Sequence, residues 1–208
     1  KTPTYVGNAQ IKTNNYAPIT GATSSLYFDG TGDRVTFADS ADWAMGSGDW
    51  TIEAWICPDF TGQERYFLSQ ATALGAFYSF LFGVNTTPVF YPRASDGTNV
   101  WGLGTVGACP ANTWRHVGAS RYGNIVSTFV HGVYPTGSAS NAWSGRSLMD
   151  SAGALSIGSY GPDNGSTYPW KGWVDQVRIA KGVGTYQGGY PRTVAGAYTV
   201  PTAPFPHS

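Results

Sequence analysis

Hydrophobic and polar residues alternate along several short stretches of this chain, as they do in β-strands that have one buried face. The clearest case is residues 50–56, where Ile52, Ala54 and Ile56 fall on one face of the expected strand. Further strands are predicted at residues 26–28, 34–37, 66–70, 77–84, 89–92, 99–103, 114–121, 125–131, 154–157 and 170–179. Gly, Pro, Asn and Ser separate these stretches, and no helical period is sustained. The pattern predicts an all-β chain whose antiparallel strands form a sandwich or a barrel.

The two ends of the chain lack this alternation. Residues 1–24 are polar, and we expect them to form an extended N-terminal arm with a short strand near residues 4–6. Residues 187–208 include closely spaced prolines near their end, which favour an extended tail. The length of 208 residues suits one sandwich domain. The predicted organisation is therefore an arm at 1–24, one domain at 25–186 and a tail at 187–208.

The composition supports this fold class and narrows the choice of partners. Charged residues make up 12% of the chain, about half of the usual share, and the helix-favouring Glu and Lys are scarce. The formal net charge is zero without any basic run, which argues against nucleic acid and anionic membranes as partners. No apolar run reaches the roughly 18 residues of a membrane span, so we expect no membrane insertion. Because the sequence begins with Lys1 rather than Met, we expect a processed, trimmed or incomplete chain.

Two cysteines allow two interpretations. Cys57 and Cys109 each end a strand-like run, and each precedes a proline. One interpretation is a disulfide between two strand ends, and the other is a pair of buried free thiols that act as small hydrophobes. Two thiols outside a CxxC pair do not make a structural zinc site by themselves.

Five motifs, in order along the chain, resemble those of a known family. They are LYFDGTGD followed by VTF at 26–37, GDWTIEAWI at 48–56, NTWRHV at 112–117, FVHG at 129–132 and KGWVDQVRI at 171–179. Each is similar to a motif of laminin-G-like jelly rolls in the concanavalin A-like superfamily, such as the strand DFTIEAWV or the closing strand GYIDEVRI. The resemblance covers residues 25 to 186. It implies a two-sheet antiparallel jelly-roll sandwich.

The C-terminal residues resemble the ending of laminin-G-like domains that are common in phage structural proteins. IAKGVGTY at 179–186 and YTVPTAPFP at 198–206 are similar to that family's RITKGVARY and PPTAPFP, with a longer connection between them here. The resemblance implies a virion surface protein as the setting, with an extracellular or secreted protein as the alternative. The implied partners are other virion proteins or further copies of this chain, as a homo-oligomer joined through the terminal arms.

Glycoside hydrolysis is the activity to weigh, because laminarinase-type enzymes resemble this chain in fold. Those enzymes place two carboxylates beside the scissile bond through an E-x-D-x-x-E spacing. The chain has only two glutamates, Glu53 and Glu64, and neither lies in that spacing. We therefore expect no enzyme activity and no catalytic residues.

We expect the charged and imidazole side chains on the predicted strands to stabilise the fold rather than to act in catalysis or metal binding. Glu53 and Arg178 lie on strands that the family places side by side, and we expect an ion pair between them. His116 and His131 lie on the two strands of one predicted hairpin. We interpret them as a cross-strand pair beside aromatic residues rather than as a metal site or a triad, because no G-x-S-x-G motif accompanies them.

Calcium is the cofactor that the resemblance implies. In related jelly rolls, a structural calcium ion is held by the Asp of the closing strand and by loop carbonyls. The matching ligands here are Asp175 and the carbonyls of Gly46 and Gly48, with Asp29 as a further ligand. Calcium prefers such oxygen ligands, but Asp residues also cap turns.

A glycan site needs exposed aromatic rings that stack on the faces of sugars. The candidates are the aromatic residues in or beside the long loops, namely Trp101, Trp143, Tyr160, Tyr168 and Trp170.

Three functions remain open for this chain. The first is a non-catalytic virion surface module, in a fibre or a decoration protein, that binds glycan or the host surface. The second is a structural coat component without a ligand, and the third is a cellular or secreted carbohydrate-binding adhesion module.

Overall fold

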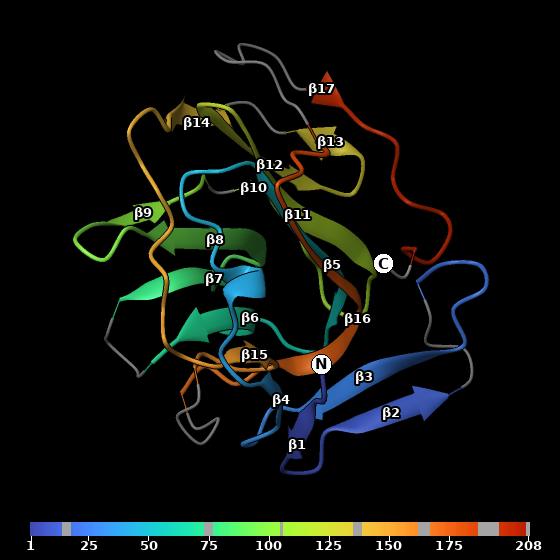
Figure 1. Cartoon of the computed structure of the whole chain (residues 1–208). Coiled ribbons are helices and arrows are strands. Elements are labelled where there is room, and N and C mark those ends of the chain that lie inside the picture. Colours follow the sequence, from blue (N-terminus) through green and yellow to red (C-terminus); the bar gives the residue numbers. More distant parts are fainter. Residues whose placement is uncertain are drawn as a thin grey trace.

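The computed structural model describes residues 1–13, 18–72, 77–104, 106–134, 139–161, 167–186 and 196–206. These residues form two antiparallel β-sheets that pack face to face, with the short 3-10 helix η1 (Ala41–Trp43) beside them (Figure 1). The all-β class and the two-sheet sandwich predicted from the sequence are both confirmed. No helix in the described part of the chain is long and apolar enough to cross a membrane.

Each sheet is named here by its strands in spatial order. Sheet A contains β1 (Thr4–Val6), β4 (Arg34–Phe37), β15 (Leu155–Ile157), β6 (Arg65–Ala71), β7 (Tyr78–Val84), β8 (Val89–Ser95) and β10 (Val106–Ala108), with β9 (Val100–Gly102) also paired to β8. Sheet B contains β17 (Gly196–Ala197), β13 (Val133–Tyr134), β12 (Ile125–Val130), β11 (Arg115–Tyr122), β5 (Trp50–Pro58), β16 (Lys171–Lys181), β3 (Ser24–Asp29) and β2 (Gln10–Thr13), with β14 (Ala139–Ala142) also paired to β12.

Strand β5 lies inside sheet B, between β11 and β16. Its alternation is the predicted one, because Ile52, Ala54 and Ile56 are fully buried in the core between the sheets. The side chains on its opposite face, Glu53 among them, are buried as well. A strand that is buried on both faces requires a layer of protein over the outer face of sheet B.

Aromatic side chains fill much of the space between the sheets. Phe67 on β6, Phe82 on β7 and Phe90 on β8 contact one another. Trp170 packs against Phe67 with 5.4 Å between the ring centroids. Truncating one of these buried rings to alanine should cost about 3–5 kcal/mol, because it leaves a cavity in a close-packed core.

The N-terminal segment belongs to both sheets. β1 pairs with β4 in sheet A, and β2 pairs with β3 in sheet B. Between them the Asn8 N–H donates to Asp33 Oδ1 at 2.7 Å, and Gly7 takes a positive φ of 74° against the same aspartate. The residues expected to form an extended arm therefore add a strand to each sheet, and the sequence predicts only the first of the two.

The C-terminal segment folds back over the outer face of sheet B. Just after β16, the Gly182 N–H donates to the Asp49 carbonyl at 2.7 Å. Further along, β17 pairs with β13, and the Tyr198 N–H donates to the Gly132 carbonyl at 2.9 Å. We call residues 182–186 and 196–206 the C-terminal cover; its second part is the red end of the chain in Figure 1.

Both cysteines are buried free thiols, so the free-thiol interpretation is confirmed and the disulfide is not formed. Burial raises the pKa of Cys57 to about 11 and that of Cys109 to about 12. Both therefore stay protonated near neutral pH and pack as small hydrophobic side chains.

Candidate functional site

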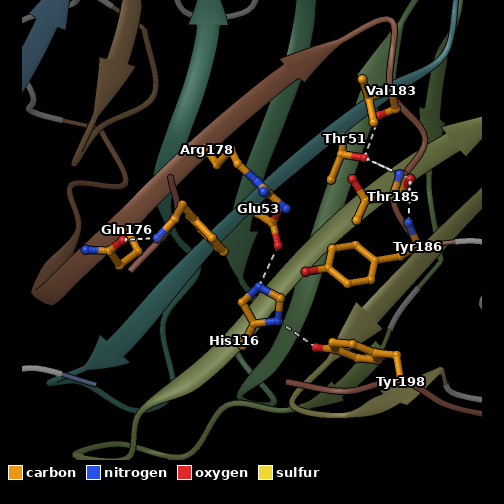
Figure 2. Close-up of polar contacts among 11 residues, drawn as sticks. Thr51, Glu53, His116, Gln176, Arg178, Val183, Thr185, Tyr186 and Tyr198 are labelled. Carbon is orange, nitrogen blue, oxygen red and sulfur yellow. Dashed lines mark hydrogen bonds and ion pairs between the residues drawn. The ribbon is translucent and has the colours of Figure 1, made fainter. Parts of the chain in front are cut away.

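A buried network of charged and polar side chains lies on the outer face of sheet B (Figure 2). Glu53 on β5, His116 on β11 and Arg178 on β16 meet because their strands are neighbours; Glu53 pairs directly with Arg178. Glu53 Oε2 is 2.7 Å from His116 Nε2, and Arg178 Nε donates to Glu53 Oε1 at 2.6 Å. The ion pair predicted between Glu53 and Arg178 is confirmed.

The proton positions in this network follow from its donors and acceptors. A carboxylate only accepts hydrogen bonds, so His116 Nε2 carries the hydrogen that faces Glu53. His116 Nδ1 then accepts from the Tyr198 hydroxyl, whose oxygen is 2.7 Å away. Burial lowers the pKa of His116, and Glu53 opposes this shift only in part. The folded state therefore holds a neutral imidazole between a carboxylate and a phenol.

The C-terminal cover shields these groups from solvent. The Phe205 ring centroid is 4.3 Å from the Arg178 guanidinium carbon, a cation–π contact, and the Phe205 N–H donates to Gln176 Oε1 at 2.9 Å. The Thr51 hydroxyl donates to the Val183 carbonyl at 2.7 Å (Figure 2). The carboxylate and the imidazole beneath have no solvent-exposed surface. The network thus attaches the cover to the sheet and offers no group to a ligand.

His131 lies opposite His116, as the sequence predicts. The register of β11 and β12 places the two residues across from each other, and the His131 N–H donates to the His116 carbonyl at 2.6 Å. Trp55 contacts both imidazole rings, at centroid distances of 5.5 and 5.6 Å. The cross-strand pair beside an aromatic residue is confirmed.

Tyrosines gather on the outer face of sheet A. We define the tyrosine face by its members: Tyr66, Tyr78, Tyr91, Tyr160 and Tyr168, together with Glu64 and Arg93. The Tyr66 ring lies at its centre, 5.7 Å from the ring centroids of both Tyr160 and Tyr168. Gly83 pairs with Tyr66, and a Cβ at Gly83 would collide with the Tyr66 ring. Glycine at this position therefore lets the ring lie across β7.

Tyr168 is the exposed tyrosine of this face. Its side chain is 45% exposed, and its backbone has a φ of 53°, a left-handed conformation that is uncommon for residues other than glycine. The Tyr168 carbonyl accepts a hydrogen bond from the Tyr66 N–H at 3.1 Å, which anchors it to β6. Backbone strain of this kind tends to occur at functional sites, and here it presents an aromatic ring from a loop that is hydrogen-bonded to β6.

Arg93 and Glu64 supply polar groups beside these rings. Arg93 Nη2 is 3.4 Å from Glu64 Oε1, and the guanidinium lies over the Tyr91 ring at 4.2 Å. The Tyr66 hydroxyl donates to Glu64. Burial raises the pKa of Tyr78 to about 12 and also raises that of Tyr66, so both hydroxyls remain protonated donors.

Comparison with known proteins identifies the family. A family model described as the concanavalin A-like lectin/glucanases superfamily matches residues 29–187. The chain belongs to this superfamily. No curated protein matches the chain.

Three solved structures share the fold of this superfamily member at low sequence identity. Domain 4 of AbnA, a GH43 extracellular arabinanase from Geobacillus stearothermophilus solved in complex with arabinotriose, is 14% identical with a TM-score of 0.63, over 88% of this chain and 84% of that one. The tailspike protein 2 of Escherichia coli O157:H7 bacteriophage CAB120 is 14% identical with a TM-score of 0.57, over 86% of this chain and 25% of that one. Mouse laminin alpha1 domains LG4-5 are 12% identical with a TM-score of 0.53, over 74% of this chain and 40% of that one.

The five aromatic residues predicted for glycan stacking do not form one cluster. Trp170 is fully buried between the sheets, and Trp143 is almost fully buried against Trp101, with 5.6 Å between their ring centroids. As surface residues for stacking, Trp143 and Trp170 are wrong predictions, because a buried ring offers no face to a sugar. Tyr160 and Tyr168 lie elsewhere, on the tyrosine face, and Tyr168 is the more exposed of the two.

The other members of the tyrosine face are missed from the sequence, because only aromatic residues in or beside the long loops are taken as candidates for glycan binding. A signal for them is present in the alternation of β8, where Phe90 and Ala94 are buried in the core. Tyr91 and Arg93 occupy the intervening positions, whose side chains point to the outer face.

The calcium ligands that the superfamily resemblance implies do not fit a single ion. The four residues are Asp175, Gly46, Gly48 and Asp29. Lys181 on β16 pairs with Trp50, which follows Gly46 and Gly48 closely in the sequence. Asp175 lies six residues from Lys181 along β16, so Asp175 and the two glycines are about 20 Å apart. Asp29 pairs with Lys171, about 13 Å from Asp175 along the same strand. Among the described residues, no group of three or more His, Cys, Asp or Glu side chains is placed to hold a metal ion.

Proposed function

We propose that this chain is a non-catalytic glycan-binding domain of a virion surface protein, and that the glycan binds at the tyrosine face. The observation that carries the proposal is the exposed ring of Tyr168, which is held in a strained backbone conformation. It contacts the Tyr66 ring, whose hydroxyl bonds Glu64 of the Glu64–Arg93 pair. Sugar recognition uses this combination, since an aromatic ring packs on the apolar face of a sugar while polar side chains bond its hydroxyls.

The covered outer face of sheet B supports the choice of the tyrosine face as the glycan site. The C-terminal cover lies over the outer face of sheet B, where Tyr198 and Phe205 contact the buried network. A glycan would have to displace the cover before it could reach Glu53 or His116. The tyrosine face, in contrast, presents an exposed ring with partly exposed charged side chains beside it.

The similar structures favour a glycan as ligand and a virion as setting. The arabinanase domain was solved with arabinotriose, and the tailspike is a bacteriophage protein. The YTVPTAPFP motif at 198–206, which resembles the ending of phage structural domains, adds to the second point. A secreted adhesion module would use the same face and is the alternative setting.

Binding without hydrolysis is proposed because the tyrosine face has too few carboxylates. Glycoside hydrolases hold two carboxyl groups about 5–9.5 Å apart on either side of the scissile bond. Glu64 is the only carboxylate among the residues that define the tyrosine face, and Arg93 and the Tyr66 hydroxyl already engage it.

A glycan array on the whole chain, followed by calorimetry with the best ligand, tests the proposal. Tyr168→Ala should weaken binding by at least about tenfold, because it removes the stacking ring. Tyr122→Ala is the matched control, since Tyr122 is 54% exposed but lies at the end of β11 in sheet B. Failure to bind any glycan, or an equal loss in both variants, would contradict the proposal.

A further inference from the structure

The second part of the C-terminal cover, residues 196–206, lies on the outer face of sheet B in the manner of a bound peptide. It begins with β17, which adds a strand to β13 at the edge of sheet B. Two aromatic anchors follow, Tyr198 and Phe205, with Pro201 and Pro204 between them. Strand addition at a sheet edge and docking of proline-rich segments on aromatic side chains are recurring modes of peptide recognition. We call the surface beneath this segment the docking surface, and its members are β13, His116, Phe129, Gln176, Arg178 and Tyr186.

Tyr198 is the first anchor of the segment. Its N–H donates to the Gly132 carbonyl at 2.9 Å, and its hydroxyl donates to His116 Nδ1 at 2.7 Å. Three rings pack around the Tyr198 ring at centroid distances of 5.1, 5.3 and 5.1 Å, and they are Phe129, Tyr134 and Tyr186. Because the buried neutral imidazole needs a hydrogen-bond donor at Nδ1, the docking surface favours tyrosine over phenylalanine at this position.

Phe205 is the second anchor, and a bulge in β16 supplies its polar partner. Asp175 and Arg178 are three residues apart on β16, but their partners on β5 are two residues apart, so β16 carries an extra residue between them. Gln176 lies in this bulge, and its Oε1 accepts the Phe205 N–H at 2.9 Å. The Phe205 ring centroid is 4.3 Å from the Arg178 guanidinium carbon. The bulge therefore provides an acceptor for a backbone N–H that lies outside the strand pairing of the sheet.

The two parts of the cover are attached to sheet B independently. The first part, residues 182–186, is held at Thr51, whose hydroxyl donates to the Val183 carbonyl at 2.7 Å and accepts from the Thr185 N–H at 2.9 Å. The anchors of the second part use other residues of the sheet. Residues 187–195 join the two parts, and nine residues can span at most about 30 Å, roughly the diameter of a small domain. The second part can therefore leave the sheet and reach an adjacent copy while the first part stays in place.

We propose that copies of this chain exchange their C-terminal segments, so that residues 196–206 of each copy occupy the docking surface of the other. The occupant is a second copy because the segment and its docking surface belong to the same sequence. Each anchor contact is non-covalent and forms equally well within one chain or between two. A reciprocal exchange keeps these contacts in both copies and closes as a symmetric dimer. The prolines restrict the backbone of a released segment, which lowers the entropic cost of docking it again.

Concentration decides between the two arrangements. A segment tethered to its own chain meets the docking surface at an effective concentration of about millimolar. A reciprocal exchange loses no anchor contact, but it costs the independent motion of two separate molecules. We therefore expect a monomer in dilute solution and a dimer where copies are held close together. This exchange involves sheet B and does not depend on glycan binding at the tyrosine face.

Peptide binding to the full-length chain tests whether the docking surface accepts a segment from another molecule. The double variant Tyr198→Ser/Phe205→Ser removes both anchors from the chain's own segment, and a fluorescent peptide of residues 196–206 should then bind. The wild-type chain, whose docking surface is occupied, should bind this peptide at least about tenfold more weakly. Replacing the tyrosine of the peptide with phenylalanine should weaken binding about three- to tenfold, because the hydrogen bond to His116 is lost. Absence of peptide binding to the double variant, or equal binding of a scrambled peptide, overturns the proposal.

Exchange between whole chains is measured on the wild type. Two batches labelled with donor and acceptor dyes should show energy transfer after mixing at about millimolar concentration, and sedimentation should show a dimer. Phe205→Ser alters a partly exposed side chain, keeps the test decisive if the double variant fails to fold, and should weaken the dimer about tenfold. Val183→Ser is the matched control, because its side chain is 53% exposed and only its carbonyl bonds Thr51. A wild type that stays monomeric at every concentration, or an equal dimer in Phe205→Ser, contradicts the exchange.

Discussion

Replacing Glu53 with glutamine measures how strongly the buried network stabilises the fold. The substitution keeps the shape of the side chain but removes the charge that pairs with Arg178 and faces His116 Nε2. Glu53 is fully buried at the centre of this network. An uncompensated guanidinium would then remain beneath the ring of Phe205.

The expected loss of stability follows from the burial of the two partners. Removing one member of a buried ion pair costs about 3–5 kcal/mol. The lower end applies here, because the Arg178 side chain is 27% exposed and solvent can stabilise part of its charge. We expect Glu53→Gln to lower the free energy of unfolding by about 3 kcal/mol, which corresponds to roughly 6–12 °C in Tm for a domain of this size.

Urea unfolding with linear extrapolation and thermal unfolding measure this loss. The chain supplies a matched control in its other glutamate, Glu64, which is partly exposed and 3.4 Å from Arg93. Surface ion pairs contribute about 0–1 kcal/mol, so Glu64→Gln should have little effect on stability. A loss in Glu53→Gln no larger than that in Glu64→Gln would refute the reasoning.

Three other perturbations have defined outcomes. Because burial lowers the pKa of His116 below its ordinary 6.5, the unfolded chain takes up a proton first, and stability measured by urea unfolding should fall as the pH drops below 6.5. His116→Gln should flatten that fall, and an unchanged slope would contradict this role. Tyr168→Gly should be more stable than Tyr168→Ala by about 1 kcal/mol, because glycine relieves the positive φ, yet both should lose glycan binding; equal melting temperatures would exclude the strain. EDTA should leave Tm unchanged, since Asp29 and Asp175 lie about 13 Å apart along the β16 ladder, and a decrease that calcium reverses would show a calcium site.

How far the sequence predicts the fold is clearest at β5. The alternation over residues 50–56 identifies Ile52, Ala54 and Ile56 as core, because a strand with one buried face needs only local periodicity. The same alternation correctly places Glu53 on the outer face. It does not reveal that this face is covered, because the covering residue Tyr198 comes from the far end of the chain. Periodicity reports which face a side chain occupies and not which distant segment packs on that face.

In the candidate site, too, the local sequence does not tell which aromatic side chains are buried in the core and which lie on an outer face. Trp170 is predicted at the start of the strand 170–179, beside a long loop, and as a surface ring, yet its side chain enters the core. Tyr66 and Tyr91 read as core because they are strand aromatics, yet they lie on the outer face of sheet A. Tyr168 was predictable as an exposed loop aromatic, whereas its positive φ depends on the hydrogen bond from Tyr66 and has no local sequence signal.

The Pro-rich ending has a physical role that composition alone does not show. Pro201, Pro204 and Pro206 favour an extended backbone and lack N–H groups, so this part of the chain needs few hydrogen-bond partners. Phe205, between two of these prolines, donates its N–H to Gln176 and lays its ring on Arg178. The prolines therefore hold extended a segment whose one aromatic side chain is fixed to β16.

The C-terminal cover is the reason why the outer face of sheet B is closed over Glu53 and His116. The outer face of sheet B carries Glu53 and His116, which are fully buried and would be costly to bury without hydrogen-bond partners. The cover satisfies the imidazole through Tyr198 and closes that face. Sheet A has an exposed ring at Tyr168, which is why the glycan-binding proposal rests on the tyrosine face. A chain cut before Tyr198 would therefore expose a second polar and aromatic face, and binding experiments on such a fragment would no longer report on the tyrosine face alone.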